Sequence, residues 1–342
     1  MENTAFLRSL IDAASKPCII VHTHPDGDAI GSGTAMLLYL RNTLGKDAVL
    51  IVPDSVPANL AFVDGGLALD ASSFPEKAAD AIRQADLVII QDLNRLDRIE
   101  QLEAQVRACT VPKVLIDHHQ DPETEAFDCF FSQPARSSTC ELLYFILKDL
   151  QGGSTSALPP ECLAALMTGM TTDTNNFANS VEPDTLRMAG ELLEAGVDRD
   201  AILQHLYNED RRERILAFAD MTANHTVILP CGLSYMIMTR EMQQRYALQD
   251  GETEGLVNIP LKIKNVLMSV FLREEGGLFR VSIRSKRGWS ARKMATELFH
   301  GGGHELAAGG KLRWPSDIAE RDAAEEFLKN TAARFLREKA RF

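Results

Sequence analysis

The sequence of 342 residues contains no long apolar run and no paired cysteine motif. Purely apolar stretches such as Leu87–Ile90 have the length of a strand, whereas a membrane-spanning helix needs about 18–20 apolar residues. The N-terminal segment resembles an amphipathic helix and lacks a basic region followed by an apolar one, so we expect no secretory signal. These absences predict a cytoplasmic protein that does not bind membranes.

Six cysteines, at positions 18, 109, 129, 140, 162 and 231, form no CxxC pair. Most of them lie within apolar stretches, which predicts buried and reduced thiols rather than disulfides or a zinc ribbon. Two catalytic signatures are also missing from the chain. The absence of GxxxxGK[ST] argues against a P-loop NTPase, and the absence of GxSxG argues against a serine hydrolase.

The chain length and the order of its apolar segments predict two domains. In the first half, strand-length apolar runs alternate with helical patterns, which is typical of a parallel sheet covered by helices on both faces in an α/β domain. The expected strands are 17–22, 48–52, 86–91, 113–116 and 127–131, and the expected helices are 30–44, 75–84, 96–108, 139–150, 160–171, 184–195 and 198–207.

After about residue 210 the pattern changes to strands joined by hairpins, which predicts a smaller α+β domain. The expected strands are 226–229, 233–239, 266–272, 278–283 and 311–314, and the expected helices are 289–299 and 317–340. Glu275-Gly276-Gly277 suits a hairpin turn. We therefore predict domains over 1–215 and 230–342, with a linker region over 216–229.

The net charge of −12 is distributed unevenly along the chain. Residues 235–342 hold 19 Lys and Arg against 14 Asp and Glu, which is a net charge of +5, so residues 1–234 carry −17. An acidic portion followed by a basic one suits a metal-holding domain and an anion-binding domain, although solvated surface charge gives the same balance. The overall negative field disfavours duplex DNA as a partner.

Acidic and histidine residues cluster where apolar segments end. Three clusters directly follow predicted strands and a fourth follows a helical run: 22–28 (HTHPDGD), Asp92, 117–119 (DHH) and 173–174 (DT). Ligands of an open parallel sheet bind beyond the carboxyl ends of its strands, so these groups can converge. So many carboxylates require cations, and mixed His/Asp ligation favours Mn²⁺, Zn²⁺ or Fe²⁺ over Ca²⁺.

Each cluster taken alone has a structural alternative. Asp26-Gly27-Asp28 also fits a surface turn, and Asp117 also fits a helix N-cap. An isolated aspartate at a strand end is structural in about half of cases, because loops carry both turn and catalytic residues. Four such ends in one chain favour a functional site.

These motifs resemble those of the DHH phosphoesterase superfamily, in the superfamily's order. The resemblance rests on HTHPDGDAIGS, the QD of VIIQD, IDHH, and TTDT followed by Phe177, and it extends to the DHH-associated C-terminal domain through GGGH and AAGG at residues 301–310. It covers about residues 17–312 and implies an active site in the cleft between the two domains. We expect a chain unlike RecJ-type exonucleases, whose extra domains do not fit in 342 residues, and unlike membrane-bound cyclic-dinucleotide phosphodiesterases, whose membrane segments precede a core that begins here by residue 17. The GGGH motif separates the chain from family II pyrophosphatases, which resemble it only in the metal motifs.

The remaining compact group is that of the bifunctional oligoribonucleases (nano-RNases) and phosphatases of adenosine 3′,5′-bisphosphate (pAp). The resemblance thus implies an exonuclease-like phosphoesterase for single-stranded RNAs of two to five nucleotides, for pAp, or for both. It implies two divalent ions, Mn²⁺ by preference, that activate a hydroxide, and it suggests a homodimer. A soluble phosphodiesterase of cyclic di-AMP or pApA is the alternative, and a nucleotide-binding regulator without activity is less favoured because no ligand is lost.

The same resemblance implies roles for individual residues. Metal one is assigned to His22 and Asp26, metal two to Asp28, His118 and Asp173, and the bridging position to Asp92. His119 is expected to face the substrate phosphate, and both His119 and Asp92 are expected to take part in catalysis. Asp117 is expected to orient the ligand His118. His24 is expected to lie outside the ligand set. Asn175 stands where the family usually has glycine, and we expect it to adopt the left-handed backbone conformation.

In the second domain the resemblance implies a phosphate-binding site. Arg284 is expected to act in catalysis and, with Ser285, Gly301, Gly302, Gly303 and His304, to bind substrate. A guanidinium suits bidentate phosphate binding, and glycines let backbone N–H groups approach an anion. His304 is expected just before a short helix. The basic run also contains Arg280, Lys286, Arg287, Arg292 and Lys293, for which a solvated basic edge strand is the alternative.

Overall fold

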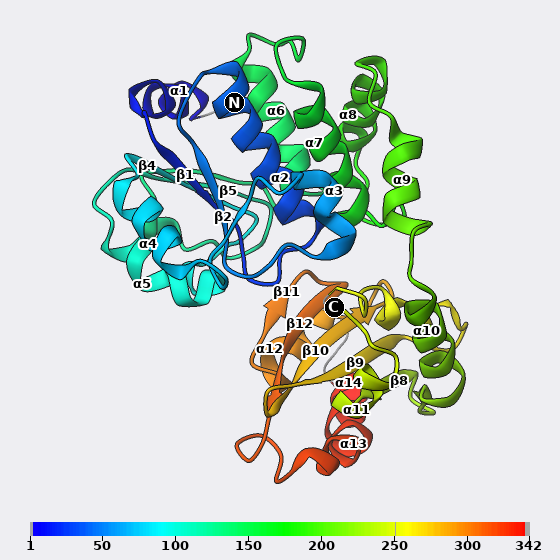
Figure 1. Ribbon diagram of the computed structural model, residues 1–342. Coiled ribbons are helices and arrows are strands. Elements are labelled where there is room, and N and C mark those ends of the chain that lie inside the picture. Colours follow the sequence, from blue (N-terminus) through cyan, green and yellow to red (C-terminus); the bar gives the residue numbers. More distant parts are fainter. Residues whose placement is uncertain (1–2, 250, 339–342) are drawn as a thin grey trace. The chain divides into compact units, whose positions relative to one another are not determined.

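The computed structural model describes residues 3–249 and 251–338 (Figure 1). The chain divides into two compact units, Met1–Glu209 and Asp210–Phe342. Residues 216–229, expected as a linker region, lie largely in helix α10 (Arg212–Asn224) and strand β7 (Val227–Ile228) of the second unit. Each unit has its own sheet and its own hydrophobic cores.

The first unit contains a six-stranded sheet in the order β3-β2-β1-β4-β5-β6, in which every neighbouring pair is parallel. The strands are β1 (Pro17–Ile20), β2 (Val49–Val52), β3 (Leu69–Asp70), β4 (Leu87–Gln91), β5 (Lys113–Asp117) and β6 (Cys129–Ser132). The chain runs outward from β1 to β3 and then returns to β4 on the other side of β1. This reversal places β1 and β4 side by side at the switch point, where open α/β sheets bind ligands.

Helices cover both faces of this sheet (Figure 1), as the sequence predicts. Alternate residues of β1 enter different cores, since Ile19 packs with helices α1, α2, α6, α7 and α8 whereas Ile20 packs with α4 and α5. The helices are α1 (Thr4–Ala13), α2 (Gly27–Leu38), α3 (Ala61–Asp64), α4 (Pro75–Gln84), α5 (Glu103–Ala108), α6 (Thr139–Leu150), α7 (Pro160–Asp173), α8 (Pro183–Glu194) and α9 (Arg199–Tyr207). The predicted α/β class is therefore confirmed.

Two predicted helices of this unit differ in detail. The helix expected over 96–108 is a 3₁₀ segment, Leu96–Leu102, followed by α5, because the backbone kinks at Glu100 (φ 41°, ψ −105°). The helix expected over 30–44 begins earlier, at Gly27, and ends in a π-turn over Tyr39–Thr43. The two-residue strand β3 lies outside the predicted set because it is too short to show an apolar period.

The second unit contains a mixed sheet in the order β11-β12-β10-β9-β8-β7, in which only the β8–β9 pair is parallel among the described residues. Besides β7, the strands are β8 (Leu233–Met238), β9 (Met268–Glu275), β10 (Leu278–Ser285), β11 (Gly302–Gly303) and β12 (Ala307–Arg313). Besides α10, the helices are α11 (Arg240–Arg245), α12 (Ala291–Leu298), α13 (Ala324–Phe327) and α14 (Ala333–Glu338). The predicted α+β texture of this unit is confirmed.

The last predicted helix, 317–340, is interrupted. A 3₁₀ turn (Arg321–Ala323) precedes α13, and a π-turn (Leu328–Ala332) separates α13 from α14; residues 339–340 lie outside the described part. Strand β12 begins four residues earlier than expected and pairs with the unexpected strand β11. His304 therefore lies in the turn between two strands, and the prediction that it precedes a short helix is wrong because backbone pairing captures this glycine-rich segment.

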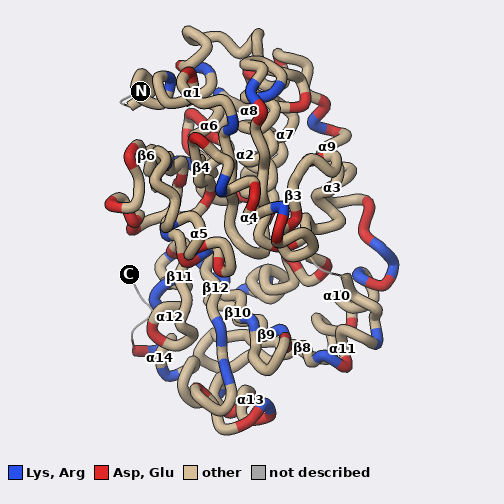
Figure 2. The backbone as a smooth tube through the Cα atoms, turned by 60° about the vertical axis from the view of Figure 1, so that its left-hand side comes forward, with Lys and Arg blue, Asp and Glu red and all other residues tan. Residues whose placement is uncertain are grey.

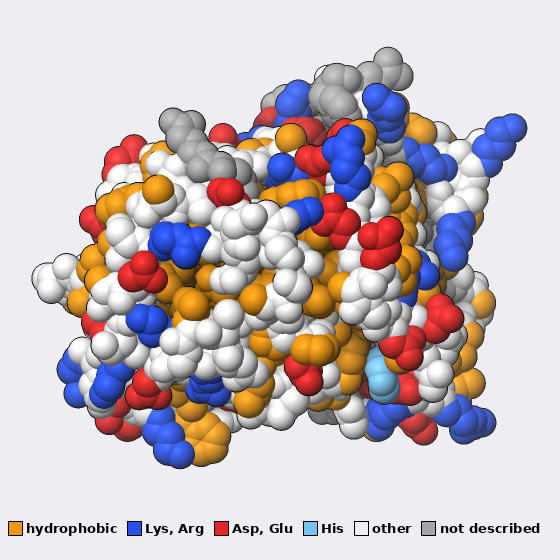
Figure 3. All heavy atoms as spheres, turned by 90° about the horizontal axis from the view of Figure 1, so that it is seen from above, with side chains coloured by type: hydrophobic (Ala, Val, Ile, Leu, Met, Phe, Trp, Pro, Cys, Tyr) orange, Lys and Arg blue, Asp and Glu red, His pale blue; other side chains and the backbone are white. Residues whose placement is uncertain are grey.

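Charged residues of both signs are distributed along the backbone (Figure 2), with basic positions along β10 and β12. Acidic and basic side chains are interspersed over the face drawn in Figure 3. All six cysteines are free, and four of them are buried, as predicted. Within the part of the chain that the structure describes, no helix is both long enough and apolar enough to cross a bilayer.

Candidate metal centre

Three neighbouring strands of the first unit end in residues that meet at one edge of the sheet. His22 lies two residues beyond β1, Asp92 directly follows β4, and His118 directly follows β5. Because β1, β4 and β5 are adjacent and parallel, their carboxyl ends bring these three side chains together. Asp28 at the start of α2 and Asp173 at the end of α7 complete the cluster.

The first potential ligand group contains His22, Asp26 and Asp92. The Nε2 atom of His22 lies 3.8 Å from Oδ1 of Asp26 and 3.4 Å from Oδ2 of Asp92. His22 and Asp92 are buried, whereas the side chain of Asp26 is 48% exposed. The structure thus brings together the three residues assigned to metal one and to the bridge, and Asp26 is the one of them that solvent reaches.

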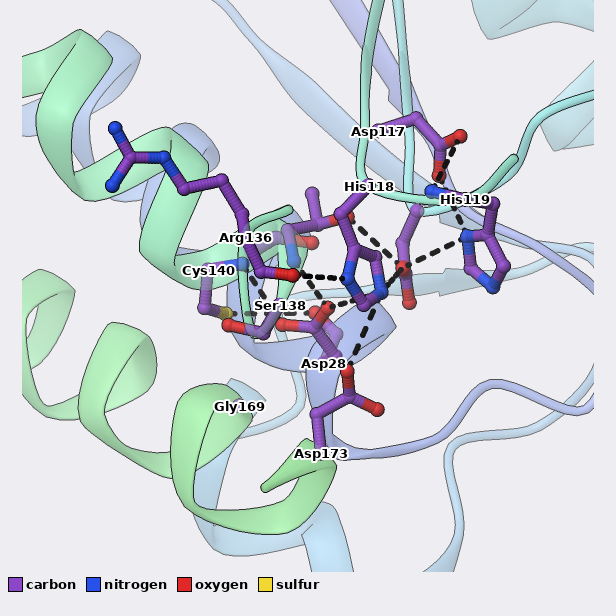
Figure 4. Close-up of polar contacts among 12 residues, drawn as sticks. Asp28, Asp117, His118, His119, Arg136, Ser138, Cys140, Gly169 and Asp173 are labelled. Atoms are coloured by element: carbon purple, nitrogen blue, oxygen red, sulfur yellow. Dashed lines mark hydrogen bonds and ion pairs between the residues drawn. The ribbon is translucent and has the colours of Figure 1, made fainter. Parts of the chain in front are cut away.

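The second group contains Asp28, His118 and Asp173 (Figure 4). The Nε2 atom of His118 lies 3.3 Å from Oδ2 of Asp173 and 3.7 Å from Oδ2 of Asp28. It also lies 3.7 Å from Oδ1 of Asp92, whose other oxygen faces His22. The two oxygens of one buried carboxylate thus face the two groups, which is the arrangement of a bridging ligand.

Hydrogen bonds fix which nitrogen each imidazole presents. Nδ1 of His22 donates to the carbonyl oxygen of Thr23 at 2.9 Å, and Nδ1 of His118 donates to the carbonyl oxygen of Arg136 at 3.2 Å. In both rings the Nε2 lone pair is therefore directed at the carboxylates. Such outer hydrogen bonds orient metal-binding histidines and set their tautomer.

Backbone donors position the aspartates. The carboxylate of Asp28 accepts from the amides of Thr139 (2.6 Å) and Cys140 (2.9 Å) at the N-terminus of α6. The hydroxyl of Thr139 donates to Oδ1 of Asp92 at 3.0 Å. Asp26 caps α2 by accepting from the amides of Asp28 and Ala29. One helix start, that of α6, thus supports a ligand from each of the two groups.

Glycines allow helices α2, α6 and α7 to pack closely around Asp28 and Asp173. A Cβ atom at Gly27 would lie 2.3 Å from the hydroxyl oxygen of Thr172, and one at Gly169 would lie 2.2 Å from Sγ of Cys140. Any side chain at these two positions requires the helices to move apart.

The backbone around the centre contains left-handed residues. Asp92 has φ 59°, a conformation that costs about 1–3 kcal/mol for a residue other than glycine and recurs at functional sites. Asn175 has φ 48°, as expected for the position where the family usually has glycine. Asn176 and Phe177 continue the left-handed run with φ 56° and 66°. This turn begins after Thr174, the residue that caps the end of α7.

The electrostatics of the cluster indicate a cation-binding site. Burial raises the pKa of Asp28, and the nearby charges of Asp92 and Asp173 raise it further. The pKa of Asp92 lies below its usual range, because the hydrogen bond with His22 and the charge of His119 outweigh the opposing effect of burial. Crowded carboxylates with mixed imidazole partners suit divalent transition metals. The residues present therefore fit a pair of such ions.

The first residue of the DHH triplet, Asp117, has a different partner from the expected one. Oδ1 of Asp117 lies 2.7 Å from Nδ1 of His119, and Oδ2 accepts from the amide of His119 at 3.0 Å. The prediction that Asp117 orients His118 is wrong, because side chains alternate along the extended strand end and the carbonyl of Arg136 holds His118 instead (Figure 4). Asp117 therefore orients the residue expected to face substrate.

Two other residues near the strand ends have defined partners. Nδ1 of His24 lies 3.2 Å from the carboxylate of Asp54, a residue outside both ligand groups. Arg98, which the sequence analysis missed, donates from Nη1 to Nε2 of His119 at 3.3 Å. No motif singled it out, because it lies six residues beyond Asp92 in a run that also contains Arg95.

In the second unit, the basic residues of β10 lie on one face of the strand. Arg280 and Arg284 alternate with Phe279, Val281 and Ile283, which enter the core. Arg284 is half-buried, and it pairs in register with residues of β9 and β12. This face has the alternation expected of a sheet with one covered side.

The expected substrate residue Ser285 and two basic residues near Arg284 have partners within the protein. The hydroxyl of Ser285 is buried and donates to the carbonyl oxygen of Trp289 at 2.5 Å. Lys286 donates from Nζ to the carbonyl oxygens of Ile263 (2.8 Å) and Lys264 (3.2 Å). Nε of Arg280 lies 3.6 Å from Glu275.

The glycine run has a packing reason of its own. A Cβ atom at Gly301 would lie 1.9 Å from the carbonyl oxygen of Gly309, and one at Gly303 would lie 2.7 Å from that of Ala307, whereas one at Gly302 would meet nothing within 4 Å. The amide of His304 donates to the carbonyl oxygen of Ala307 at 2.7 Å. Strand β11 thus needs two of its three glycines in order to pair with β12.

Comparisons with known proteins agree with this arrangement. The model of the DHH family, N-terminal domain, matches residues 16–170, and the model of the DHHA1 domain matches residues 235–335. The chain is 25% identical to the probable bifunctional oligoribonuclease and PAP phosphatase NrnA of Streptococcus mutans, over 96% of this chain and 99% of that protein. It is 27% identical to NrnA of Thermus thermophilus, over 91% and 89% of the two chains.

A solved structure shares the whole fold. The crystal structure of an exopolyphosphatase-related protein from Bacteroides fragilis matches with a TM-score of 0.87 and 32% identity, over 98% of both chains. The similarity covers both units and therefore the strand ends that carry the metal-site motifs. The chain belongs to the DHH family of phosphoesterases, with a DHHA1 domain in its second unit.

Proposed function

We propose that this phosphoesterase hydrolyses RNAs of about two to five nucleotides to mononucleotides, a length set by the few phosphates such a site contacts, and converts pAp to AMP. The observation that carries the proposal is the sharing of Asp92 between two His/Asp groups, with one oxygen facing each histidine. Paired metal sites of this kind serve phosphoester hydrolysis. The substrate class follows the names of the two NrnA relatives, which the chain matches over nearly their whole length.

Two divalent ions fit the centre, and we assign them as Mn²⁺ because the ligands combine imidazole and carboxylate. When bound, such ions acidify water and offset charge on the phosphoryl group. The residues assigned to hold them are His22, Asp26, Asp28, Asp92, His118 and Asp173. Among the chain's own groups, His119 is assigned to the substrate phosphate, with Asp117 fixing its ring through Nδ1.

The second unit is assigned to bind substrate. Arg284 offers a planar fork of donors for a phosphate that is not being hydrolysed. His304 and the backbone of Gly301–Gly303 are assigned to the same phosphate, and Ser285 keeps the end of β10 in place through its bond to Trp289. A substrate anchored in this way gains little from nucleotides beyond the anchor, because each added phosphate meets few further basic groups.

The test is a turnover panel with the full chain and Mn²⁺. Its substrates are pAp, RNAs of 2 to about 24 nucleotides, pApA, cyclic di-AMP, pyrophosphate and inorganic polyphosphate. We expect turnover of pAp and of the short RNAs, with kcat/KM falling steeply beyond about five nucleotides. Equal kcat/KM at both ends of the RNA series would instead identify a processive exonuclease.

Cyclic di-AMP and pApA form the second candidate class, since the same metal groups would hydrolyse them. Preferred turnover of either over pAp and trinucleotide would assign the chain to dinucleotide hydrolysis. Preferred turnover of polyphosphate would follow the name of the Bacteroides relative. A protein that binds nucleotides with no turnover in any arm would be a regulator, and the intact ligand set argues against that outcome.

A further inference from the structure

Arg98 is held at the metal centre by its backbone. It lies in the 3₁₀ segment that follows β4, and its carbonyl oxygen accepts from both the amide and the hydroxyl of Thr23, each at 2.9 Å. Thr23 is the residue next to His22. These two bonds tie the loop after β4 to the loop after β1, so the Cα of Arg98 has a fixed position beside the first ligand group. They require the backbone of residue 98 and not its side chain.

The side chain of Arg98 reaches the ring of His119. Nη1 lies 3.3 Å from Nε2 of His119, while Nδ1 of the same ring is bonded to Asp117. The Nδ1 atom lies 3.8 Å from Oδ1 of Asp92. The guanidinium is therefore separated from the carboxylate shared by the two ligand groups by the width of one imidazole.

Arg98 differs from neighbouring arginines in its lack of an acidic partner. Arg95 is paired with Asp97 at 3.2 Å, and Arg107 is paired with Glu103 at 2.8 Å. Across residues 3–249 and 251–338, no carboxylate oxygen lies within 4.0 Å of the Arg98 guanidinium. A half-buried guanidinium without a counter-ion is unfavourable, and its five donors match the oxygens of a phosphate.

We propose that Arg98 is a catalytic residue that binds the non-bridging oxygens of the phosphoryl group being hydrolysed. This inference rests on the proposed phosphoester hydrolysis and adds a cation of the first unit to it. Arg98 exchanges its bond to His119 Nε2 for bonds to phosphate, and no covalent step passes through it. Because charge grows on these oxygens during in-line attack, the guanidinium contributes more to the transition state than to the ground state.

The position of Arg98 gives the proposal a specific signature. Every substrate places its scissile phosphate at the metal groups, whatever lies beyond it. The loss of Arg98 therefore lowers kcat by the same factor for pAp and for a trinucleotide. A residue that bound the rest of the substrate would instead affect KM, and the factor would depend on substrate length.

The experiment compares Arg98→Ala and Arg98→Lys with Arg95→Ala, which removes an exposed arginine of the same loop. Isothermal titration of inorganic phosphate into each Mn²⁺-loaded protein measures anion binding, and titration of Mn²⁺ measures the metal sites. We expect Arg98→Ala to weaken phosphate binding by about 10–100-fold, the range for a hydrogen bond to a charged group. We expect its kcat to fall by about 10²–10³-fold with both substrates. Arg98→Lys keeps the charge but not the planar set of donors, so we expect its phosphate affinity and kcat to lie between those of Arg98→Ala and the wild type. We expect Arg95→Ala to match the wild type in both.

Two results would overturn the proposal. One is phosphate affinity of Arg98→Ala equal to that of the wild type, and the other is a loss of Mn²⁺ affinity large enough to explain its lower activity. The phosphate titration does not depend on which ester is the substrate. If the wild type hydrolysed none of the nucleotides, the proposed function would fail while the titration still decided the role of Arg98. Both variants keep the backbone bonds to Thr23, so we expect them to fold.

Discussion

The two units hold their functional residues in different ways. In the first unit, Asp28 and Asp92 are each 1% exposed and are fixed by donors from α6. In the second unit, Arg284 and His304 are half-buried and lie on a strand face and in a hairpin turn. Metal ligands need fixed positions because coordination geometry is exacting, whereas a phosphate grip tolerates movement because its donors are long and charged. The first unit therefore holds its metal ligands in fixed positions, whereas the phosphate-binding residues of the second unit can adapt to the substrate.

The largest effect is expected from Asp92→Asn, because the amide replaces one of the two carboxylate oxygens that face the two ligand groups. We expect kcat to fall by several orders of magnitude and Mn²⁺ binding to weaken at both groups, while the fold persists. Titration with Mn²⁺ and a turnover assay measure these effects. Asp97→Asn, an exposed aspartate of the following loop, is the control. Full activity of Asp92→Asn at high Mn²⁺ would refute the shared-ligand assignment.

A smaller effect is expected from Arg284→Ala, which tests the grip alone. We expect KM to rise by about 10–100-fold, the range for losing hydrogen bonds to a charged group, with Mn²⁺ affinity unchanged. Steady-state kinetics with pAp and a trinucleotide provide the measurement. Lys286→Ala removes a basic residue that is bonded to the backbone carbonyls of residues 263 and 264, so it serves as the matched control. Kinetics unchanged by Arg284→Ala would mean that the second unit recognises substrate elsewhere.

The smallest expected effect separates packing from phosphate binding in the glycine run. Gly301→Ala places a Cβ against the carbonyl of Gly309, whereas Gly302→Ala meets open space. We expect the first change to lower the free energy of unfolding by about 1–3 kcal/mol through overpacking and the second to leave it unchanged. Denaturant unfolding of both variants measures this. If Gly302→Ala raised KM despite normal stability, backbone contact with substrate at that position would be supported.

The fold and the site of the first unit were largely predictable, because the order of the parallel strands determines which residues meet at their carboxyl ends. Strand-length apolar runs predict parallel strands, and their carboxyl ends predict where His22, Asp92 and His118 meet. The left-handed turn at Asn175 was also predictable, because asparagine tolerates that conformation. The pairing of ligands into two groups came from the family resemblance and not from periodicity.

Other features could not be read from the sequence, because they depend on where a side chain points after the strand ends. The partner of Asp117 is His119 and not His118, a difference of one residue that extended backbone converts into opposite directions. Arg98 carries no local signal, since it stands out only because none of the carboxylates in the described part of the chain lies within ion-pair distance of its guanidinium. Strand β11 is two residues long, and it exists only because β12 pairs with it.

The N-terminus of a helix is a common place for proteins to bind phosphate, because its free amides point outward and its dipole is positive. In this chain the first amides of α6 are already bonded to the carboxylate of Asp28. The N-terminus of α6 therefore binds the carboxylate of Asp28, and an incoming phosphate would have to displace that carboxylate to reach the same amides. Recognition of substrate at this edge of the sheet thus falls to cations, whether metal ions or guanidinium groups, so salt and competing anions should weaken substrate binding more than they weaken the fold.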